Sequence, residues 1–238
     1  MCQNEIFFCI RITIGAEGKT MDYKTIVEHK EVLEYYNRGN QILGALGYTD
    51  HSTAHTKLVA DRAAMILKLF GYSEEEQELA RIAGFLHDIG NVINRSRHAE
   101  YGALLANEIL EDQDIRMEDR IRIVSAIANH DESTGVAADP VAAALIIADK
   151  SDVRRSRVRN KVPAAFDIHD RVNYAVTHPR LECEPELKRI TLDLTVDEEI
   201  CSMLDYFEIF LTRMMMCSRA AEVFGAKFSL VVNEQRVL

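Results

Sequence analysis

A histidine–aspartate pair closes an apolar run at residues 83–90 (AGFLHDIG), and this stretch constrains the fold more than any other. Burying either side chain costs free energy unless a partner satisfies it. A capping-box spacing that starts at Ser73 predicts a helix over this run, with Gly90 as its left-handed cap. Because neighbouring helical residues diverge by about 100°, His87 and Asp88 could flank one metal centre, or they could simply satisfy each other.

Composition narrows the class of protein. The 238 residues are 47% hydrophobic, which is enough for one sizeable domain or for a domain with an appendage. A net charge of −10 argues against a general nucleic-acid binder. The five scattered cysteines form no CxxC pair and suit a reducing compartment. No apolar run approaches the roughly 20 residues of a membrane span, and the first residues do not read as a secretory signal. We therefore expect a soluble cytoplasmic protein with no nucleic-acid or membrane partner.

Histidine and aspartate residues recur on the predicted helices. Five helical segments each place a histidine or an aspartate on or beside an apolar face. One buried histidine is usually a satisfied core residue, but five in register with apolar faces are hard to attribute to chance. Imidazole and carboxylate groups that converge from several helices commonly form a metal site, and without a cysteine the set does not suit a structural zinc site. The residues are His55, His87, Asp88, His98, His130 and Asp149.

Two features near these residues leave alternatives open. His51 lies one turn before His55 and shares its face only if the helix extends that far. After Asp149, an arginine-rich run could clamp a phosphate-bearing substrate, or it could be a solvated helix end. Its candidate substrate-binding residues are Arg154, Arg155 and Arg157.

The chain divides into three predicted parts. Residues 1–20 form an N-terminal extension, residues 21–175 a helical domain, and residues 176–238 a small α+β unit with antiparallel strands and one long helix. The fold is therefore expected to be mainly α. A first helix is predicted over 22–37, and the glycines after it are expected to break the chain. The methionine-rich long helix, over 197–224, is expected to pack in the core, and its second use could be a homodimer face.

Three sequence stretches carry a resemblance to a known family. "HTKLVADRAAMIL", "GFLHDIG" and "LIIADKSD" resemble, in this order, the motifs of the HD-domain metal-dependent phosphohydrolases. The similarity covers about 100 residues, from 52 to 152. The family pattern of His, His-Asp and Asp implies that His55, His87, Asp88 and Asp149 hold a metal ion in a helical core.

Two further stretches resemble one branch of that family. "HAEYGALLANEIL" and "AIANHDESTG" are similar to the dinuclear branch, which includes the symmetrical dinucleoside tetraphosphatases. This resemblance implies that His98 and His130 bind a second metal ion and that Asp88 bridges the two. Ligation by nitrogen and oxygen suits manganese, iron, cobalt, nickel or zinc better than magnesium alone.

The function expected from these residues is metal-dependent hydrolysis of a phosphate ester or anhydride, with a nucleotide as the favoured substrate. Asp88 is expected to be catalytic through the metal, and Lys150 to neutralise charge in the transition state. Asp131 or Asp152 would steer protons. The alternatives are a di-iron oxygenase on the same scaffold and a non-catalytic nucleotide-binding regulatory module.

Overall fold

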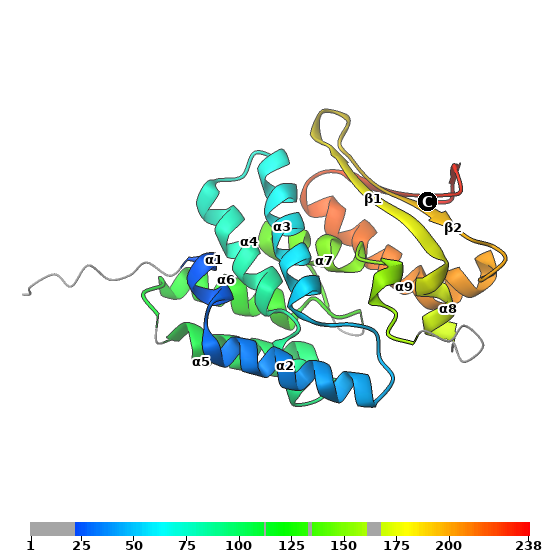
Figure 1. Cartoon of the computed structure of the whole chain (residues 1–238). Coiled ribbons are helices and arrows are strands. Elements are labelled where there is room, and N and C mark those ends of the chain that lie inside the picture. Colours follow the sequence, from blue (N-terminus) through cyan, green and yellow to red (C-terminus); the bar gives the residue numbers. More distant parts are fainter. Residues whose placement is uncertain (1–21, 112, 133–134, 161–167) are drawn as a thin grey trace, which may run out of the picture.

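The computed structural model describes residues 22–111, 113–132, 135–160 and 168–238 (Figure 1). The predicted extension at residues 1–20 lies outside the described residues. The helices of the first part are α1 (Tyr23–Val27), α2 (Lys30–Ala45), α3 (Thr53–Leu69), α4 (Glu74–Leu86), η1 (Ile89–Val92), α5 (His98–Glu111), α6 (Met117–Ala128), α7 (Pro140–Lys150) and η2 (Arg155–Arg157). The second part comprises α8 (Ile168–Ala175), β1 (Val176–Glu184), η4 (Pro185–Leu187), β2 (Arg189–Val196), α9 (Met203–Val223), β3 (Lys227–Val232) and β4 (Gln235–Arg236).

Side-chain caps fix where the site-bearing helices begin. The hydroxyl of Ser52 accepts a hydrogen bond from a backbone amide at the start of α3. Ser73 and Glu76 form the predicted capping box of α4. Asp139 caps α7, and Pro140 occupies its first turn. Each cap satisfies an amide that the helix itself leaves unpaired. The sequence therefore sets the start of these helices locally.

Helix α7 lies at the centre of the molecule. Every residue of this helix after Pro140 is buried. It contacts α3, α4, α6 and α9, so that helices from both parts of the chain cover it. A helix that is apolar on all sides must be surrounded in this way. Its carboxyl end, with Asp149, is thereby held inside the core.

A small sheet packs beside the helices and carries the long helix (Figure 1). Its strand order is β1-β2-β3-β4. β1 and β2 are antiparallel, whereas β2 and β3 are parallel, and the connection between the parallel pair contains α9. Helix α9 contacts β3 on one side and α7 on another. The predicted fold class, mainly α with a small C-terminal α+β part, is confirmed.

One buried cluster of apolar residues runs through both parts of the chain. It includes Ile146 of α7, Leu192 of β2 and Met214 of α9. The division into residues 21–175 and 176–238 stays a prediction.

The first helix differs from its prediction. Instead of one helix over 22–37, the chain forms α1 and then α2, which continues to Ala45. Gly39 and Gly44 lie inside α2 and do not break it. Gly39 is needed for packing, because a Cβ atom there would lie 3.1 Å from the backbone nitrogen of Val92 in η1.

Gly90 also has a different role from the predicted one. Helix α4 ends at Leu86, and Gly90 lies in η1 without a positive φ. A Cβ atom at Gly90 would lie 2.1 Å from the carbonyl oxygen of His98. Glycine is therefore required because η1 packs directly on the start of α5, and not because the chain turns left-handed.

Among the described residues, we find no helix with the length and apolar character needed to cross a membrane.

Candidate metal centre

Six predicted ligand residues meet in one buried cluster. Each residue lies on a helix or close to the end of one, and each side chain is almost completely buried. The residues are His55 on α3, His87 and Asp88 between α4 and η1, His98 at the first position of α5, His130 just after α6, and Asp149 near the end of α7.

The four imidazoles of this cluster have the same orientation. Nδ1 of His87, His98 and His130 lies 2.8, 2.9 and 2.6 Å from the carbonyl oxygen three residues earlier. Nδ1 of His55 lies 2.7 Å from Oδ2 of Asp152. Because these oxygens only accept, each Nδ1 carries a proton, and Nε2 is the nitrogen that remains to bind a metal ion.

The Nε2 atoms face carboxylate oxygens and one another. The buried Nε2 atoms of His55 and His87 have no hydrogen-bond partner. They lie 3.3 and 3.6 Å from Oδ1 of Asp149. Nε2 of His98 lies 3.1 Å from Nε2 of His130, although neither atom has a proton to share. Two nitrogens bound about 2.0–2.1 Å from one ion lie roughly 3.4 Å apart, so the arrangement fits a metal.

Asp88 lies between the two histidine pairs. Its Oδ2 is 3.6 Å from Nε2 of His55 and 3.3 Å from Nε2 of His87. Its Oδ1 is 3.6 Å from Nε2 of His98. The two oxygens of one carboxylate thus face different histidine pairs, as a bridging ligand requires.

Two residues that the sequence did not assign also touch Asp88. Nδ1 of His51 lies 2.6 Å from Oδ2 of Asp88, although His51 precedes the first turn of α3. Nδ2 of Asn91 donates to Oδ1 of Asp88 at 2.8 Å. The four-residue spacing of His51 and His55 was the available signal for His51. Asn91 had no such signal, because its position depends on the turn at η1.

The carboxylates and imidazoles of the cluster shift one another's pKa values. Burial alone would raise the pKa of Asp88, but His51 and His87 outweigh it and lower the pKa well below its usual value. Burial would lower the pKa of His87, yet Asp88 and Asp149 raise it to about 10. Burial lowers the pKa of His98 and lowers that of His130 strongly. A positive charge at His87 thus offsets the carboxylates, a role that a bound cation would take over.

The predicted helper residues lie around the cluster. Nζ of Lys150 is 2.7 Å from Oδ2 of Asp149, so it holds the oxygen that faces away from the histidines. Asp152 accepts from His55 and is fully buried. Oδ2 of Asp131 lies 3.9 Å from Nε2 of His98.

The three arginines predicted to bind substrate are engaged by the protein itself. Arg154 donates two hydrogen bonds to Asp152. Arg155 donates to the carbonyl oxygen of Tyr174 and lies over its ring. Arg157 donates to the carbonyl oxygens of Asp50 and Asp152. Of the three, only Arg157 lines the cavity described next.

A cavity of about 560 Å³ opens beside the cluster. Its walls come from the segment before α3, the loop after η1, η2, α8 and α9. His169 of α8 lines it as well. The ionisable residues in its wall are His51, Arg95, Glu132, Arg157, His169, Asp170 and Arg213.

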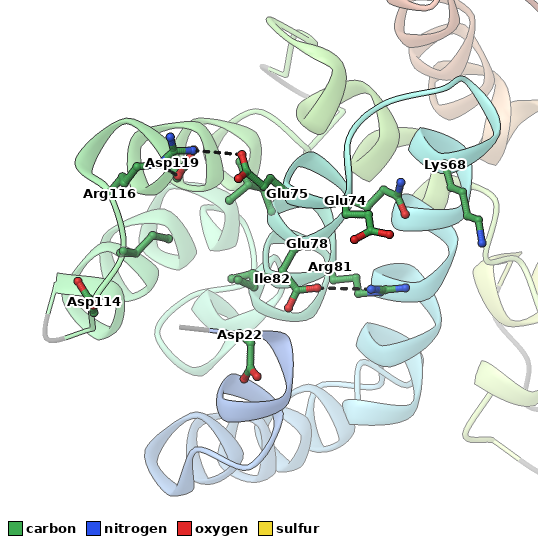
Figure 2. Close-up of a pocket in the computed structure, with 13 residues that line it drawn as sticks. Asp22, Lys68, Glu74, Glu75, Glu78, Arg81, Ile82, Asp114, Arg116 and Asp119 are labelled. Carbon is green, nitrogen blue, oxygen red and sulfur yellow. Dashed lines mark hydrogen bonds and ion pairs between the residues drawn. The ribbon is translucent and has the colours of Figure 1, made fainter. Parts of the chain in front are cut away.

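Figure 2 shows a larger cavity, of about 810 Å³, formed by α4 with parts of α1, α3 and α6. None of the six predicted ligands is among the described residues that line either cavity, but the smaller one is lined by His51 and Arg95, which lie 2.6 and 3.8 Å from the carboxylate of Asp88. In the larger cavity, five charged residues pair within the wall: Glu78 with Arg81 at 3.4 Å, and Arg116 with Glu75 and Asp119 at 3.6 and 2.7 Å. The smaller cavity is therefore the one that can hold a substrate against the cluster.

A family comparison agrees with this geometry. Residues 53–156 match the model of the HD domain family. The matched region runs from α3 to η2 and includes all six predicted ligands, whereas α8, α9 and the sheet lie outside it.

Two individual proteins are similar to the chain. The uncharacterized protein MJ1020 of Methanocaldococcus jannaschii is 28% identical over 173 residues, which cover 63% of this chain and 66% of that protein. The match thus spans just under two thirds of that relative. A crystal structure of a predicted HD superfamily hydrolase from an uncultured Thermotogales bacterium has a TM-score of 0.41 and 23% identity, over 56% of this chain and 75% of that one. A TM-score of this size supports no inference about function.

The matched residues include those whose side chains form the buried cluster, and groups of these could hold a metal ion.

Proposed function

We propose that the protein is a phosphohydrolase with two metal ions, which cleaves a phosphate ester or anhydride bond, and that its substrate is a nucleotide. The observation that carries the proposal is the shared orientation of four buried imidazoles. Each Nδ1 is tied to an acceptor, so that each Nε2 atom is turned towards the other groups of the cluster. Without a metal ion, a proton on His87 must offset the carboxylates of Asp88 and Asp149.

The ligands fall into two groups that share Asp88. His55, His87, Asp149 and Oδ2 of Asp88 would hold the first ion, since each of the two Nε2 atoms lies 3.3–3.6 Å from each of the two carboxylate oxygens. His98, His130 and Oδ1 of Asp88 would hold the second. Imidazole-rich sites of this kind favour manganese, iron, cobalt, nickel or zinc.

Bound divalent metal supplies Lewis-acid polarisation of a phosphoryl oxygen and lowers the pKa of water towards about 7. The chain's own residues orient the ligands. Lys150 fixes one oxygen of Asp149, and Asp152 fixes the tautomer of His55. Asp131, whose carboxylate is 3.9 Å from His98, is placed to accept or deliver a proton at the rim of the cluster. Arg157 keeps the wall beside His51 in place, with Nη2 at 3.4 Å from Nδ1 of His51.

The cavity supports a phosphorylated organic substrate. It combines cationic side chains beside the cluster with the apolar residues Leu46, Tyr48 and Ile209. Its volume of about 560 Å³ lies within the range of small-molecule sites. A nucleotide has both an anionic and an aromatic part, which such a wall can bind.

The test is product analysis after defined metal loading. The full-length protein is stripped with a chelator and reloaded separately with manganese, iron, cobalt or zinc. Each form then meets nucleoside mono-, di- and triphosphates, cyclic nucleotides and dinucleoside polyphosphates, and the products are separated by chromatography. We expect a metal-dependent product that contains phosphate or a shortened nucleotide.

A matched pair of variants links the activity to the cluster. His130→Ala removes a proposed ligand, and His178→Ala removes an exposed histidine on β1. We expect the first variant to lose turnover and metal content while the second keeps both. Turnover that survives His130→Ala unchanged, or a wild-type protein that no metal activates, would reject the proposal. Oxygen consumption by the iron form without phosphate release would favour an oxygenase instead.

A further inference from the structure

Three guanidinium groups line the cavity beside the metal cluster: those of Arg95, Arg157 and Arg213. They stand out in a chain whose net charge is −10. Arg157 is held in the wall, because its Nε and Nη1 donate to backbone carbonyl oxygens of Asp50 and Asp152 at 3.0 and 2.9 Å. It therefore has little capacity left for a ligand, and the other two differ from it.

Arg213 is anchored through its Nε atom. This Nε lies 2.6 Å from Oε1 of Glu132, and its guanidinium carbon is 5.3 Å from the centre of the Phe210 ring. The side chain is 24% exposed and lines the cavity. A guanidinium that is fixed at Nε and packed on a ring presents its terminal nitrogens in a defined direction. Such a fork suits a phosphoryl group.

Glu132 links this arginine to the metal cluster. The same Oε1 atom lies 3.3 Å from Nζ of Lys150, which in turn holds Asp149. Glu132 thus places one negative charge between the cations of Lys150 and Arg213. Arg213 comes from α9, outside the matched region.

Arg95 has a similar arrangement on the loop after η1. Its Nη1 donates to Oδ1 of Asn91 at 3.1 Å and lies 3.8 Å from Oδ1 of Asp88. The side chain is 23% exposed, and its guanidinium carbon is 5.8 Å from the centre of the Tyr48 ring. It too carries a charge beside the cluster that the protein does not fully satisfy.

We propose that Arg95 and Arg213 bind the non-bridging oxygens of the substrate's phosphoryl group, so that α9 completes a site whose metal ligands all lie in the matched region. The inference rests on the proposed function in one respect, since it takes the substrate to be phosphorylated. It assigns the C-terminal part of the chain a direct role in substrate binding.

The experiment uses inorganic phosphate as the probe, because the substrate is not identified. Phosphate binding to the manganese-loaded, full-length protein is measured by calorimetry for the wild type, Arg213→Met and Arg219→Met. Arg219 is the matched control, since it is an exposed arginine on the same helix. Because hydrogen bonds to charged groups are strong, we expect Arg213→Met to raise the Kd for phosphate about tenfold to a hundredfold and Arg219→Met to leave it unchanged. Metal content should be equal in all three.

A second variant at the same position keeps the test valid if Arg213→Met does not fold. Arg213→Lys keeps the charge and can still pair with Glu132, but it lacks the planar fork. We expect it to fold and to bind phosphate more weakly than the wild type does. KM for p-nitrophenyl phosphate should rise in both Arg213 variants, with a smaller change in kcat.

The outcomes separate the inference from the proposed function. Equal phosphate affinity in the wild type and in a folded Arg213 variant overturns the inference, even if the wild type hydrolyses phosphate esters. A wild type that does not bind phosphate overturns it as well. Phosphate binding that depends on Arg213 supports the inference even if no phosphate ester is hydrolysed, in which case only the proposed function fails.

Discussion

Asp152 shows how one buried residue prepares a ligand. Its Oδ2 fixes the proton of His55 on Nδ1, and its other oxygen accepts from Arg154 at 2.5 Å. Burial alone would raise its pKa, but the hydrogen bonds from His55 and Arg154 lower it, so that it remains a carboxylate. Asp152→Asn keeps the shape and removes the charge. We expect metal affinity to fall about tenfold to a hundredfold, measured by competition with a chromophoric chelator.

The control for this variant lies on the same helix as His55. Asp61→Asn makes the same chemical change at an exposed position of α3. It should leave metal affinity unchanged. Equal affinities for the two variants would mean that Asp152 does not tune the site.

The pKa of His87 predicts how many protons are released when a metal ion binds. In the metal-free chain its pKa of about 10 keeps it protonated at pH 7.5, while burial keeps His51, His98 and His130 neutral. Binding at His87 must therefore release one proton, and affinity should rise about tenfold per pH unit up to about pH 10. Calorimetry in two buffers with different heats of ionisation measures this number. No proton release at pH 7.5 would show that His87 is already neutral.

The raised pKa of His87 also affects the stability of the metal-free protein. The folded-state pKa of His87 lies above the unfolded value of about 6.5. Its contribution is therefore complete below about pH 6.5 and is lost as the pH rises through about 10. Urea titrations of the metal-free protein between these values should show falling stability, and His178→Ala should not change the slope.

The residues of the cluster could be predicted because each lies on or beside an apolar helical face of the sequence pattern, and burial of a polar residue there requires a reason. The roles of two groups of residues could not be predicted in this way. His51 lies outside α3, so helical periodicity did not include it. Arg213 could not be assigned because its role depends on how α9 packs on α7. The interactions that engage Arg154 and Arg155, with Asp152 and Tyr174, are likewise products of tertiary packing.

At the scale of elements, the contact between α3 and α4 sets the distance between His55 and His87. A Cβ atom at Gly84 would lie 2.7 Å from Cα of Ala60, so that the two backbones touch. Gly84→Ala must separate the helices. We expect a loss of about 1–3 kcal/mol of unfolding free energy, or roughly 2–12 °C in Tm, together with weaker metal binding.

Gly44→Ala is the matched control. Gly44 is an exposed helical residue of α2, and a Cβ atom there would meet only the Arg159 side chain, at 3.4 Å. Alanine should leave Tm unchanged or raise it slightly, because it is the better helix former. An equal response to both substitutions would rule out a specific role for the contact between α3 and α4.

Helix boundaries followed from the sequence where a side chain caps the helix, as at Ser73. Helix boundaries could not be predicted from the sequence where packing between elements determines them. Helix α2 continues through Gly39 and Gly44, although glycine is a poor helix former, because Gly39 lets α2 approach η1. The β1 strand, Val176–Glu184, includes many polar residues, which its edge position in the sheet allows.

At the scale of the whole molecule, the central position of α7 determines which parts of the chain can fold alone. Ten consecutive residues of α7, Val141 to Lys150, are buried, and α9 covers one side of them. A fragment of residues 1–175 would expose that side, including the region of Asp149. We expect this fragment to lack the cooperative thermal transition of the full chain and to bind metal weakly, as measured by circular dichroism and chelator competition. Co-expression with residues 176–238 should restore both properties, because the missing cover is supplied in trans. A fragment of residues 1–175 that unfolds at the full-chain Tm with unchanged metal affinity would instead show that the helical domain is independent, and α9 would then contribute only to substrate binding.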